Sequence, residues 1–589
     1  MDFKAKIKQE WPAIAILAVA AIARLALLGL KPPHFDEGVN GWFVDQMTHN
    51  GYYHYDPENY HGPLHFYILF LAQTLLGRHV WALRLPLALA GVAAVYLTLK
   101  FDRFMGRDAS RWAALAVAIS PGCVFYSRYA IHEYWLVLSL MLCAWGMAGL
   151  WASGERRYFW AIVFGATGAV LTKETYFIHF GCALLTLPAV WVLSRIEPAT
   201  EGGPLPAPQW TERDALLGCL FFLGCVLFFY SGGLMDIHGL RGLYLTYNAW
   251  AKTGHSGHGH EKAWYYWLQL CGRYEWPALI GIVTALLFAI PRWLRLIPIL
   301  AAGVVLGLVA QDIIRHGMHW QNHLVGVLPR DTIIAAAAVL YLGSFLLLLI
   351  PEIPTPRVIR ALGIYGCGAL AAYSIIHYKT PWCIVSLTWP FYLLFGWAVA
   401  SLLARFRGSP VSMLIRAGAT GILAAGAVYM VYLNFFHYSD AAEQYVYVQT
   451  YPDVNKLVDP VLAIAARNPA NYEMSGHIIM DSYHPLPWLL GDFTNVGYFN
   501  DQAEAPAQMD ADFLLVEETR VDEVEAALRD SYFTTPLHLR DAQDVSTLYL
   551  SVKKFGVLFP GRKPDFVPQP TETPASPTPF PLPSPPPDR

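Results

Sequence analysis

Two adjacent carboxylates, Asp36 and Glu37, are the first pair of residues in the chain that could take part in a reaction. They stand in the run HFDEG at positions 34–38, shortly after an apolar run over 11–30. A carboxylate pair in this position can act as a general base or hold a divalent cation. Asp36 could instead cap the N-terminus of a helix that starts near Gly38. The spacing alone leaves these two interpretations open.

The next 25 residues are rich in aromatic, amide and carboxylate side chains. Aromatic faces combined with such polar groups are typical of surfaces that bind sugars. We therefore predict substrate contacts from Trp42, Tyr55, Tyr60 and His61. Tyr and Trp are also enriched where membrane proteins meet the water interface, so an interfacial aromatic belt explains the same composition.

Three cations stand at predicted membrane edges, each beside polar or aromatic residues. Arg128 lies in the sequence YSRYAIHE, Lys173 in LTKET and Lys379 in HYKTPW. Lys and Arg at such places could bind the phosphate of a lipid. Snorkelling toward the interface explains a single cation well, and three such sites less well. An ion pair of Lys173 with Glu174 or another neighbour is a third interpretation.

A histidine-rich loop follows at 254–262, with the sequence GHSGHGHEK. His258 and His260 could bind a metal together with neighbouring side chains. The glycines make the loop mobile, and the spacing matches no rigid zinc site. A lid or substrate-sensing loop explains the sequence about as well as a metal site, and adventitious metal binding explains it better than either.

The composition excludes an ordinary soluble enzyme. The chain has 589 residues, of which 55% are hydrophobic and only 14% are charged, whereas soluble domains carry about 25% charged residues. The net charge is divided unevenly, with +9 over residues 1–434 and −12 over residues 435–589. Two regions in different solvents are therefore expected. Nothing in this balance indicates nucleic-acid binding.

Long apolar runs recur through residues 1–434. A helix needs about 20 apolar residues to span a bilayer. About thirteen spans are predicted, at 11–30, 80–100, 112–127, 133–152, 159–172, 176–194, 214–233, 274–290, 296–310, 332–350, 361–376, 384–403 and 413–434. Arg24 in the first span is expected to snorkel or to face other helices. Apolar 63–76 would break the charge alternation as a span, so we interpret it as an amphipathic or re-entrant helix in the first outer loop, 31–79.

Charged loops predict the orientation. Short cytoplasmic loops are enriched in Lys and Arg, and the basic loops alternate as required when the N-terminus is cytoplasmic. None of the twenty His falls in a predicted cytoplasmic loop. An odd number of spans then places the C-terminal region outside. We predict a multi-pass protein of the plasma (inner) membrane with an extracytoplasmic C-terminal domain.

Residues 437–558 lose the membrane pattern. Short β-type runs at 478–480, 513–516 and 548–552 alternate with helical stretches at 454–466 and 521–528. This alternation indicates a small α/β domain. Residues 562–589 are rich in proline and predict a disordered tail. The predicted fold class is therefore mainly α, a polytopic membrane helical bundle over 1–434 followed by this small domain.

In these residues the chain resembles the polytopic GT-C glycosyltransferases, such as the protein mannosyltransferases and the aminoarabinose transferase of lipid A. The shared motifs are GPLHFY at 62–67, RLPLAL at 84–89 and YAIHE at 129–133. A subgroup labelled flippase-activity-associated in archaeal N-glycosylation is more similar still. Its signatures appear here as DEGVNGW at 36–42, YDPENYHGPL at 55–64, GHGHEKAWYY at 257–266 and KTPW at 379–382.

The resemblance implies an integral membrane glycosyltransferase. It would move a hexosyl or pentosyl group from a polyprenyl-phosphate-linked donor to an acceptor on the extracytoplasmic face, with inversion. Asp36 would accept the proton of the acceptor hydroxyl, and Glu37 and Glu133 would orient it or support a cation. The implied partners are the lipid-linked sugar, membrane lipid and an acceptor that is protein, lipid or glycan. A divalent cation is the one cofactor considered.

Further roles follow from the same resemblance. Arg128, Lys173 and Lys379 would neutralise the donor phosphate, and Trp382 would contact substrate. The sequence departs from the aminoarabinose transferases at Gly62, where those enzymes have Lys before the Pro of the first-loop motif. The later acidic residue is Glu133, where Asp is usual.

Two other classes of function compete. A flippase or flippase partner for lipid-linked sugars, without bond-making, is supported by the subgroup label. The absence of ionisable residues at mid-membrane and of repeated halves argues against it. A scaffold that displays the acidic C-terminal domain would leave the clusters of the outer loops unexplained.

Overall fold

A computed structural model describes residues 3–59, 61–196, 206–256, 259–289, 355–501, 506–541 and 543–568, with isolated positions between 300 and 311. The chain divides into two units, Met1–Gln449 and Thr450–Arg589. The first unit extends beyond the expected boundary at 434 because residues 435–449 pack onto it. The predicted spans 296–310 and 332–350 fall almost wholly outside the described residues. The same is true of the predicted tail from residue 569 onward.

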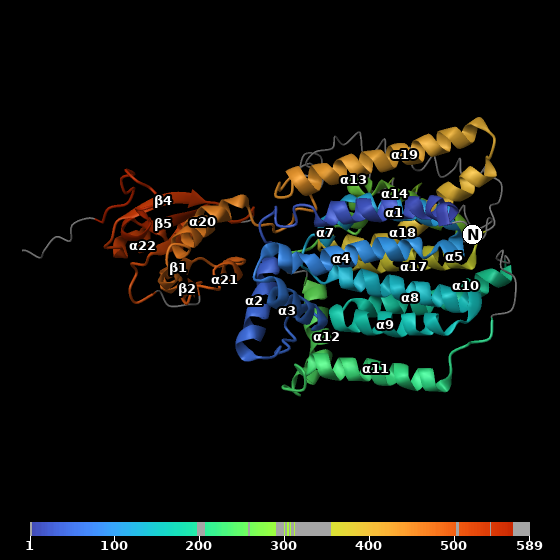
Figure 1. Cartoon of the computed structure of the whole chain (residues 1–589), viewed down its shortest axis with the longest axis horizontal. Coiled ribbons are helices and arrows are strands. Elements are labelled where there is room, and N and C mark those ends of the chain that lie inside the picture. The colour runs from blue at the N-terminus through green and yellow to red at the C-terminus, as the bar shows by residue number, and fades with distance from the viewer. Residues whose placement is uncertain are drawn as a thin grey trace, which may run out of the picture. The chain divides into compact units, whose positions relative to one another are not determined.

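The first unit is a helical bundle. Helices α1, α4, α8, α9, α17, α18 and α19 lie roughly side by side, and α2 and α3 lie at the end opposite the N-terminus (Figure 1). We call this the α2 end. The bounds are α1 Phe3–Leu25, α2 Phe35–Asn50, α3 Leu64–Leu76, α4 Val80–Leu99, α5 Asp102–Met105, α6 Arg107–Ile119, α7 Pro121–Ser127, α8 Glu133–Ser153, α9 Arg156–Thr172, α10 Tyr176–Ile196, α11 Glu212–Tyr230, α12 Gly239–Ser256, α13 Tyr266–Tyr274, α14 Trp276–Phe288, α17 Arg357–Ile375, α18 Ile384–Arg405 and α19 Pro410–Val431.

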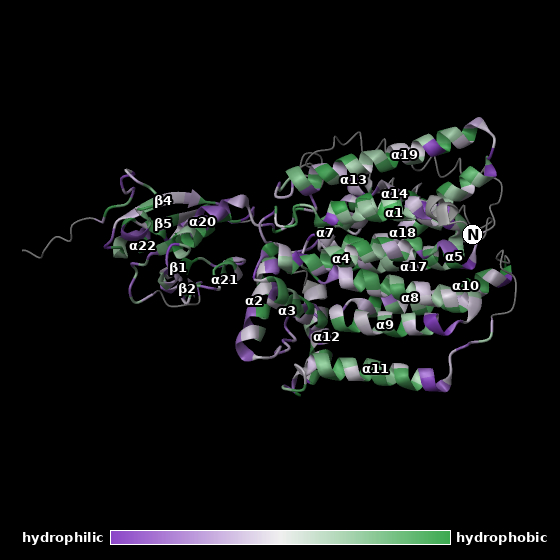
Figure 2. Cartoon of the chain, viewed as in Figure 1, coloured by the Kyte–Doolittle hydropathy of each residue, from purple (hydrophilic) through white to green (hydrophobic). Residues whose placement is uncertain are grey.

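Several helices are suited to a bilayer, and apolar residues run along their length (Figure 2). Within the described residues, seven are long and apolar enough to cross a membrane, namely Val80–Met105, Glu133–Ser153, Tyr176–Ile196, Glu212–Tyr230, Arg357–Ile375, Pro381–Arg405 and Pro410–Phe436. The protein is therefore a multi-pass membrane protein, as predicted.

Not every predicted span is a single long helix. The run 112–127 is broken at Ser120, because Pro121 starts the separate helix α7. Apolar 63–76 forms α3, a helix of 13 residues that is too short to span and packs against α2, α4 and α9. Its length argues against a single span, and its position at the outer interface stays a prediction.

Arg24 faces other helices rather than water. Its guanidinium is fully buried and donates to the carbonyls of Val117 and Ala118 at 3.0 and 2.9 Å. These carbonyls belong to the last turn of α6, where no intrahelical N–H follows to pair with them. The cation therefore stabilises the break between α6 and α7, which explains its place inside an apolar helix.

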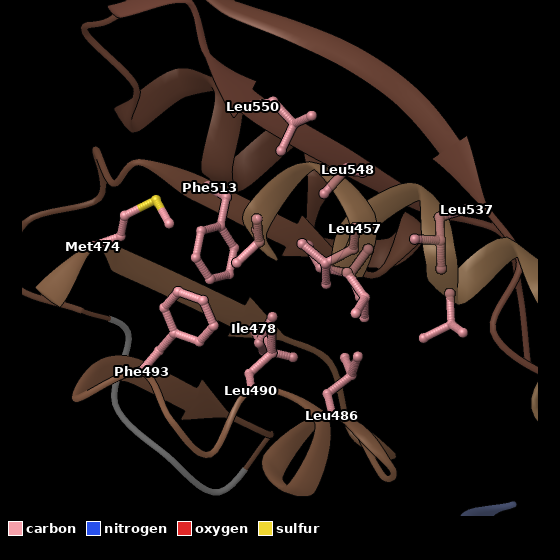
Figure 3. Packing of buried hydrophobic residues seen from close by; sticks show 14 of the residues in the cluster. Leu457, Met474, Ile478, Leu486, Leu490, Phe493, Phe513, Leu537, Leu548 and Leu550 are labelled. Carbon is pink, nitrogen blue, oxygen red and sulfur yellow. The ribbon is translucent and has the colours of Figure 1, made fainter. Parts of the chain in front are cut away.

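The second unit is a small α/β domain, as predicted. Its five-stranded sheet has the order β2-β1-β3-β5-β4, in which β1 runs parallel to β2 and β3, and β5 runs antiparallel to β3 and β4. Leu457 of α20 packs with Ile478, Phe513 and Leu548 of the sheet (Figure 3). The bounds are α20 Asn455–Ala465, β1 Ser475–Ile479, α21 Leu486–Leu489, β2 Asn495–Phe499, β3 Phe513–Val516, α22 Val521–Ala527, β4 Tyr532–Leu537, β5 Ser546–Ser551 and α23 Val552–Phe555.

Candidate active site

Helix α2 is capped by His34, not by Asp36. The Nδ1 atom of His34 accepts the backbone N–H of Asp36 at 3.0 Å, and the Glu37 carboxylate accepts the N–H of His34 at 2.9 Å. This reciprocal pair is a capping box. Because Nδ1 accepts, the ring proton lies on Nε2, which donates to the carbonyl of Tyr447 at 2.5 Å. His34 therefore fills the capping role that was considered for Asp36. The carboxylate of Asp36 remains available for other contacts.

Glu37 is a buried structural carboxylate. Arg84 donates to its two oxygens at 2.7 and 2.6 Å, and the N–H of Ala130 donates at 2.8 Å. Burial alone would raise the pKa of Glu37, but the charge and hydrogen bonds of Arg84 lower that pKa to about 2. Both oxygens of Glu37 are occupied. These contacts anchor α2 and fit a structural role better than the catalytic role expected from the sequence.

Asp36 is the accessible member of the pair. Its side chain is 36% exposed, and its Oδ2 atom lies 3.4 Å from the hydroxyl of Tyr129. Burial and the nearby carboxylates raise the pKa of Tyr129 above its usual value, so Tyr129 stays protonated as a donor. A carboxylate can act as a general base only where a substrate hydroxyl can reach it. Asp36 meets that requirement.

Residues 435–449, which we call the strap, complete this site. Besides accepting from His34, Tyr447 places its hydroxyl 2.6 Å from Nδ1 of His260. The strap is held by Tyr445, whose hydroxyl donates to Glu275 at 3.0 Å, and by Gln449 on the carbonyl of Pro32. The sequence pattern predicts that most of this segment belongs to the soluble domain, and it gives Tyr447 no role in the site. Its tyrosine-rich run QYVYVQTY was the available signal.

An aromatic group adjoins Asp36. The half-buried ring of Trp382 lies 6.0 to 6.2 Å, between centroids, from the rings of His34, Tyr129 and Tyr447. Three segments far apart in the sequence thus meet beside one carboxylate. This arrangement is compatible with the substrate contact predicted for Trp382.

The other predicted substrate residues are divided. Trp42 on α2 is 38% exposed, whereas Tyr55 is 3% exposed and its hydroxyl lies 2.6 Å from that of Thr246. Tyr55 therefore belongs to a hydrophobic core rather than to a sugar-binding surface. Tyr60 lies outside the described residues. His61 is partly exposed and contacts Glu174 at 3.1 Å.

Lys173 forms a buried ion pair with Glu133 instead of with Glu174. The first loop docks beside this pair, since Gly62 donates to the carbonyl of Thr172 at 3.2 Å. A Cβ atom on Gly62 would lie 2.3 Å from backbone atoms of Leu171. Any side chain here would force the loop away, so this position requires glycine.

The other two predicted phosphate ligands also have protein partners. Arg128 donates to carbonyls at the end of α1, including Ala26 at 2.6 Å and Leu27 at 2.8 Å. Lys379 donates to the carbonyls of Ile376 and Lys262. An ammonium has three N–H groups, so Lys379 keeps one for a ligand. Lys379 thus fits the predicted role better than Arg128 or Lys173.

The predicted metal pair cannot be assembled from the described residues. His258 lies outside them, and His260 is hydrogen-bonded to Tyr447. Among the residues that the structure describes, no group of three or more His, Cys, Asp or Glu side chains is arranged to hold a metal ion.

Lys379 should bind phosphate in a pH-dependent way. Burial lowers its pKa from 10.5 to about 8, so its charge is lost as the pH rises through 8. Binding of polyprenyl phosphate should therefore weaken between pH 7 and pH 9 more strongly in the wild type than in Lys379→Arg. Lys379→Ala should bind about tenfold more weakly than wild type at pH 7, as expected for one charge-assisted hydrogen bond. Equal affinities of the Ala variant and wild type at pH 7 would leave snorkelling as the explanation.

Comparisons with known proteins concern the fold of the chain. Residues 60–196 match the family model of dolichyl-phosphate-mannose-protein mannosyltransferase. The apo structure of ArnT from Cupriavidus metallidurans has a TM-score of 0.52 at 14% identity, covering 92% of this chain and 98% of that one. Its complex with undecaprenyl phosphate gives 0.50 at 15% identity with the same coverage. The chain has the GT-C fold. The resemblance to the GT-C superfamily of membrane glycosyltransferases is thereby confirmed, and the similarity to the flippase-associated subgroup stays a prediction.

Two Bacillus subtilis proteins whose names describe them as mannosyltransferases also match. YycA is 33% identical over 105 residues, which is 17% of this chain and 15% of YycA. YkcB is 28% identical over 152 residues, which is 24% of this chain and 21% of YkcB. The matches thus span only about a fifth or less of either relative.

Proposed function

We propose that this GT-C protein transfers a sugar from a polyprenyl-phosphate-linked donor to an acceptor hydroxyl on the extracytoplasmic face, with inversion at the anomeric carbon. The observation that carries the proposal is the accessible carboxylate of Asp36, which lies beside the hydroxyl of Tyr129. The ring of Trp382 contacts the rings of Tyr129 and Tyr447. Of the three carboxylates predicted to be catalytic, Glu37 and Glu133 are buried in ion pairs.

The reaction is a single displacement. Asp36 takes the proton from the acceptor hydroxyl while that oxygen forms a bond to the anomeric carbon. The bond from the anomeric carbon to the phosphate oxygen breaks, and polyprenyl phosphate leaves with the electron pair. Positive charge develops on the sugar as in other oxocarbenium-like transfers. A cation near the leaving phosphate stabilises the charge that develops there.

The residues that the structure describes around Asp36 do not fit a divalent cation. A hard cation takes several oxygen ligands. Glu37 is occupied by Arg84, and Glu133 by Lys173. Asp36 therefore works in this proposal as a base without a metal.

The lipid-linked donor is supported by two of the comparisons. The similar ArnT structure holds undecaprenyl phosphate, and the matching family model is named for a dolichyl-phosphate-mannose donor. A glycosyl donor anchored in the bilayer also suits a site at one end of a membrane bundle.

The proposed orientation places Thr450–Arg589 outside the cytoplasm. In a cysteine-free background, Ser531→Cys should be labelled by a membrane-impermeant maleimide in intact cells. Ser531 is partly exposed in the second unit. Arg407→Cys, in an exposed loop predicted to be cytoplasmic, is the matched control and should react only after lysis. The reverse pattern would move the site to the cytoplasmic face.

The stereochemistry tests the displacement itself. With a donor of known anomeric configuration, nuclear magnetic resonance of the purified product should show the opposite configuration. A product with retained configuration would require two successive displacements, which one accessible carboxylate acting as a base does not explain.

A further inference from the structure

Lys31 carries an ammonium group that the described part of the protein leaves unsatisfied. Its side chain is 5% exposed, and its Nζ atom has no hydrogen-bond partner among the described residues. The ammonium lies 4.1 Å from the ring centre of Phe125 and 5.0 Å from that of Tyr129. Aromatic faces attract a cation but accept no conventional hydrogen bond from its three N–H groups.

The surrounding charges do not neutralise Lys31. Arg84 and Arg128 lie nearby, and the carboxylate of Glu37 is already bound by Arg84. Burial and the charge of Arg84 lower the pKa of Lys31 well below its usual value. A buried ammonium without a counter-ion is unfavourable, and the lowered pKa reflects that cost. A bound anion would remove that cost.

The position of Lys31 indicates which anion this is. Tyr129 presents its ring to Lys31 and its hydroxyl to Asp36 and His34. The unsatisfied ammonium therefore lies one aromatic ring away from the proposed base. The donor must place its phosphate next to the sugar that the acceptor attacks there.

Lys31 also differs from the other cations at the α2 end. Arg84 and Arg128 donate to a carboxylate or carbonyls, Lys173 to Glu133, and Lys379 to two carbonyls. Among these five, Lys31 alone has every N–H group without a protein acceptor in the described residues. We propose that Lys31 binds the phosphate of the polyprenyl-phosphate donor. This inference rests on the proposed function and adds the residue that recognises the leaving group. The ammonium is covered by neighbouring side chains, so an arriving phosphate has to displace one of them.

The test compares polyprenyl phosphate with the corresponding polyprenol, which has the same chain and no phosphate. Dissociation constants are measured for the purified full chain in detergent, for wild type, Lys31→Met and Lys31→Arg. Lys100→Met is the matched control, because Lys100 also lies over a ring, that of Tyr96, but follows α4 at the end away from α2. Wild type and Lys100→Met should prefer polyprenyl phosphate. Lys31→Met should lose about tenfold in that preference with unchanged polyprenol binding, and Lys31→Arg should keep most of it.

Each of the other possible outcomes would contradict a specific part of the proposal. A wild type without preference for the phosphate would contradict the proposed lipid-phosphate donor itself. A wild-type preference that persists in Lys31→Met would overturn the role of Lys31 alone. Replacing an unsatisfied buried charge by an apolar side chain of similar length should maintain or raise the melting temperature. A Lys31→Met protein that fails to fold would therefore show that Lys31 is structural and would also overturn the inference.

Discussion

Asp36→Asn should lower the rate of glycosyl transfer by about 10²–10⁴, the range that general-base catalysis usually contributes. The amide cannot accept the proton of the acceptor hydroxyl. Its size is unchanged, and the cap of α2 is provided by His34, so the fold should be unaffected. Steady-state rates, the melting temperature and binding of polyprenyl phosphate should be measured together, with only the rate changing.

Asp56→Asn is the matched control for this variant. Asp56 lies in the segment between α2 and α3, and its side chain accepts the N–H of Glu58 within a local turn. It should stay near wild-type activity. An Asp36→Asn protein with normal transfer would remove the base from the mechanism and favour the flippase hypothesis, because moving a lipid across the bilayer requires no proton acceptor at that position.

Arg84→Met should destabilise the protein by about 3–5 kcal/mol, the cost of leaving one member of a buried ion pair without its partner. Arg84 and Glu37 are both completely buried, and Arg84 also donates to the carbonyls of Leu28, Lys31 and Pro32. The first turn of α2, which carries Asp36, would thus lose its main anchor. The melting temperature in detergent should fall sharply, and transfer activity should fall with it.

Arg78→Met provides the comparison. Arg78 pairs with Asp45 at 2.7 Å, but both side chains are partly exposed. Such a pair typically contributes no more than about 1 kcal/mol. Similar shifts of the melting temperature in the two variants would contradict the distinction between a structural Glu37 and a catalytic Asp36.

The sequence alone predicted much of the fold because apolar periodicity is a local signal. Runs such as 133–152 and 384–403 closely match α8 and α18. The run 112–127 misled because composition does not register the break that Pro121 causes. In the second unit the runs in β1, β3 and β5 were found. The other two strands, β2 and β4, were missed because their residues are less apolar or include a proline.

The site was predicted less completely, because its contacts join residues far apart in the chain. Asp36 and Glu37 are neighbours and look equivalent in sequence, yet Arg84, 47 positions away, occupies only Glu37. Likewise, no local pattern predicts that Tyr447 accepts from His34, more than 400 positions away. Residue types identified the chemistry, while the division into structural and reactive groups required the three-dimensional arrangement.

One measurement tests the central claim, that the protein makes a glycosidic bond, most directly. Purified protein in detergent is incubated with polyprenyl-phosphate sugars labelled in the sugar and with candidate acceptor hydroxyls. Because detergent replaces the bilayer, lipid translocation cannot occur, and the assay detects only the formation of the glycosidic bond. We expect release of polyprenyl phosphate in equal amount to newly glycosylated acceptor, and loss of both in Asp36→Asn. An intact donor in every mixture, together with movement of the labelled lipid across proteoliposome membranes by the same preparation, would contradict the central claim.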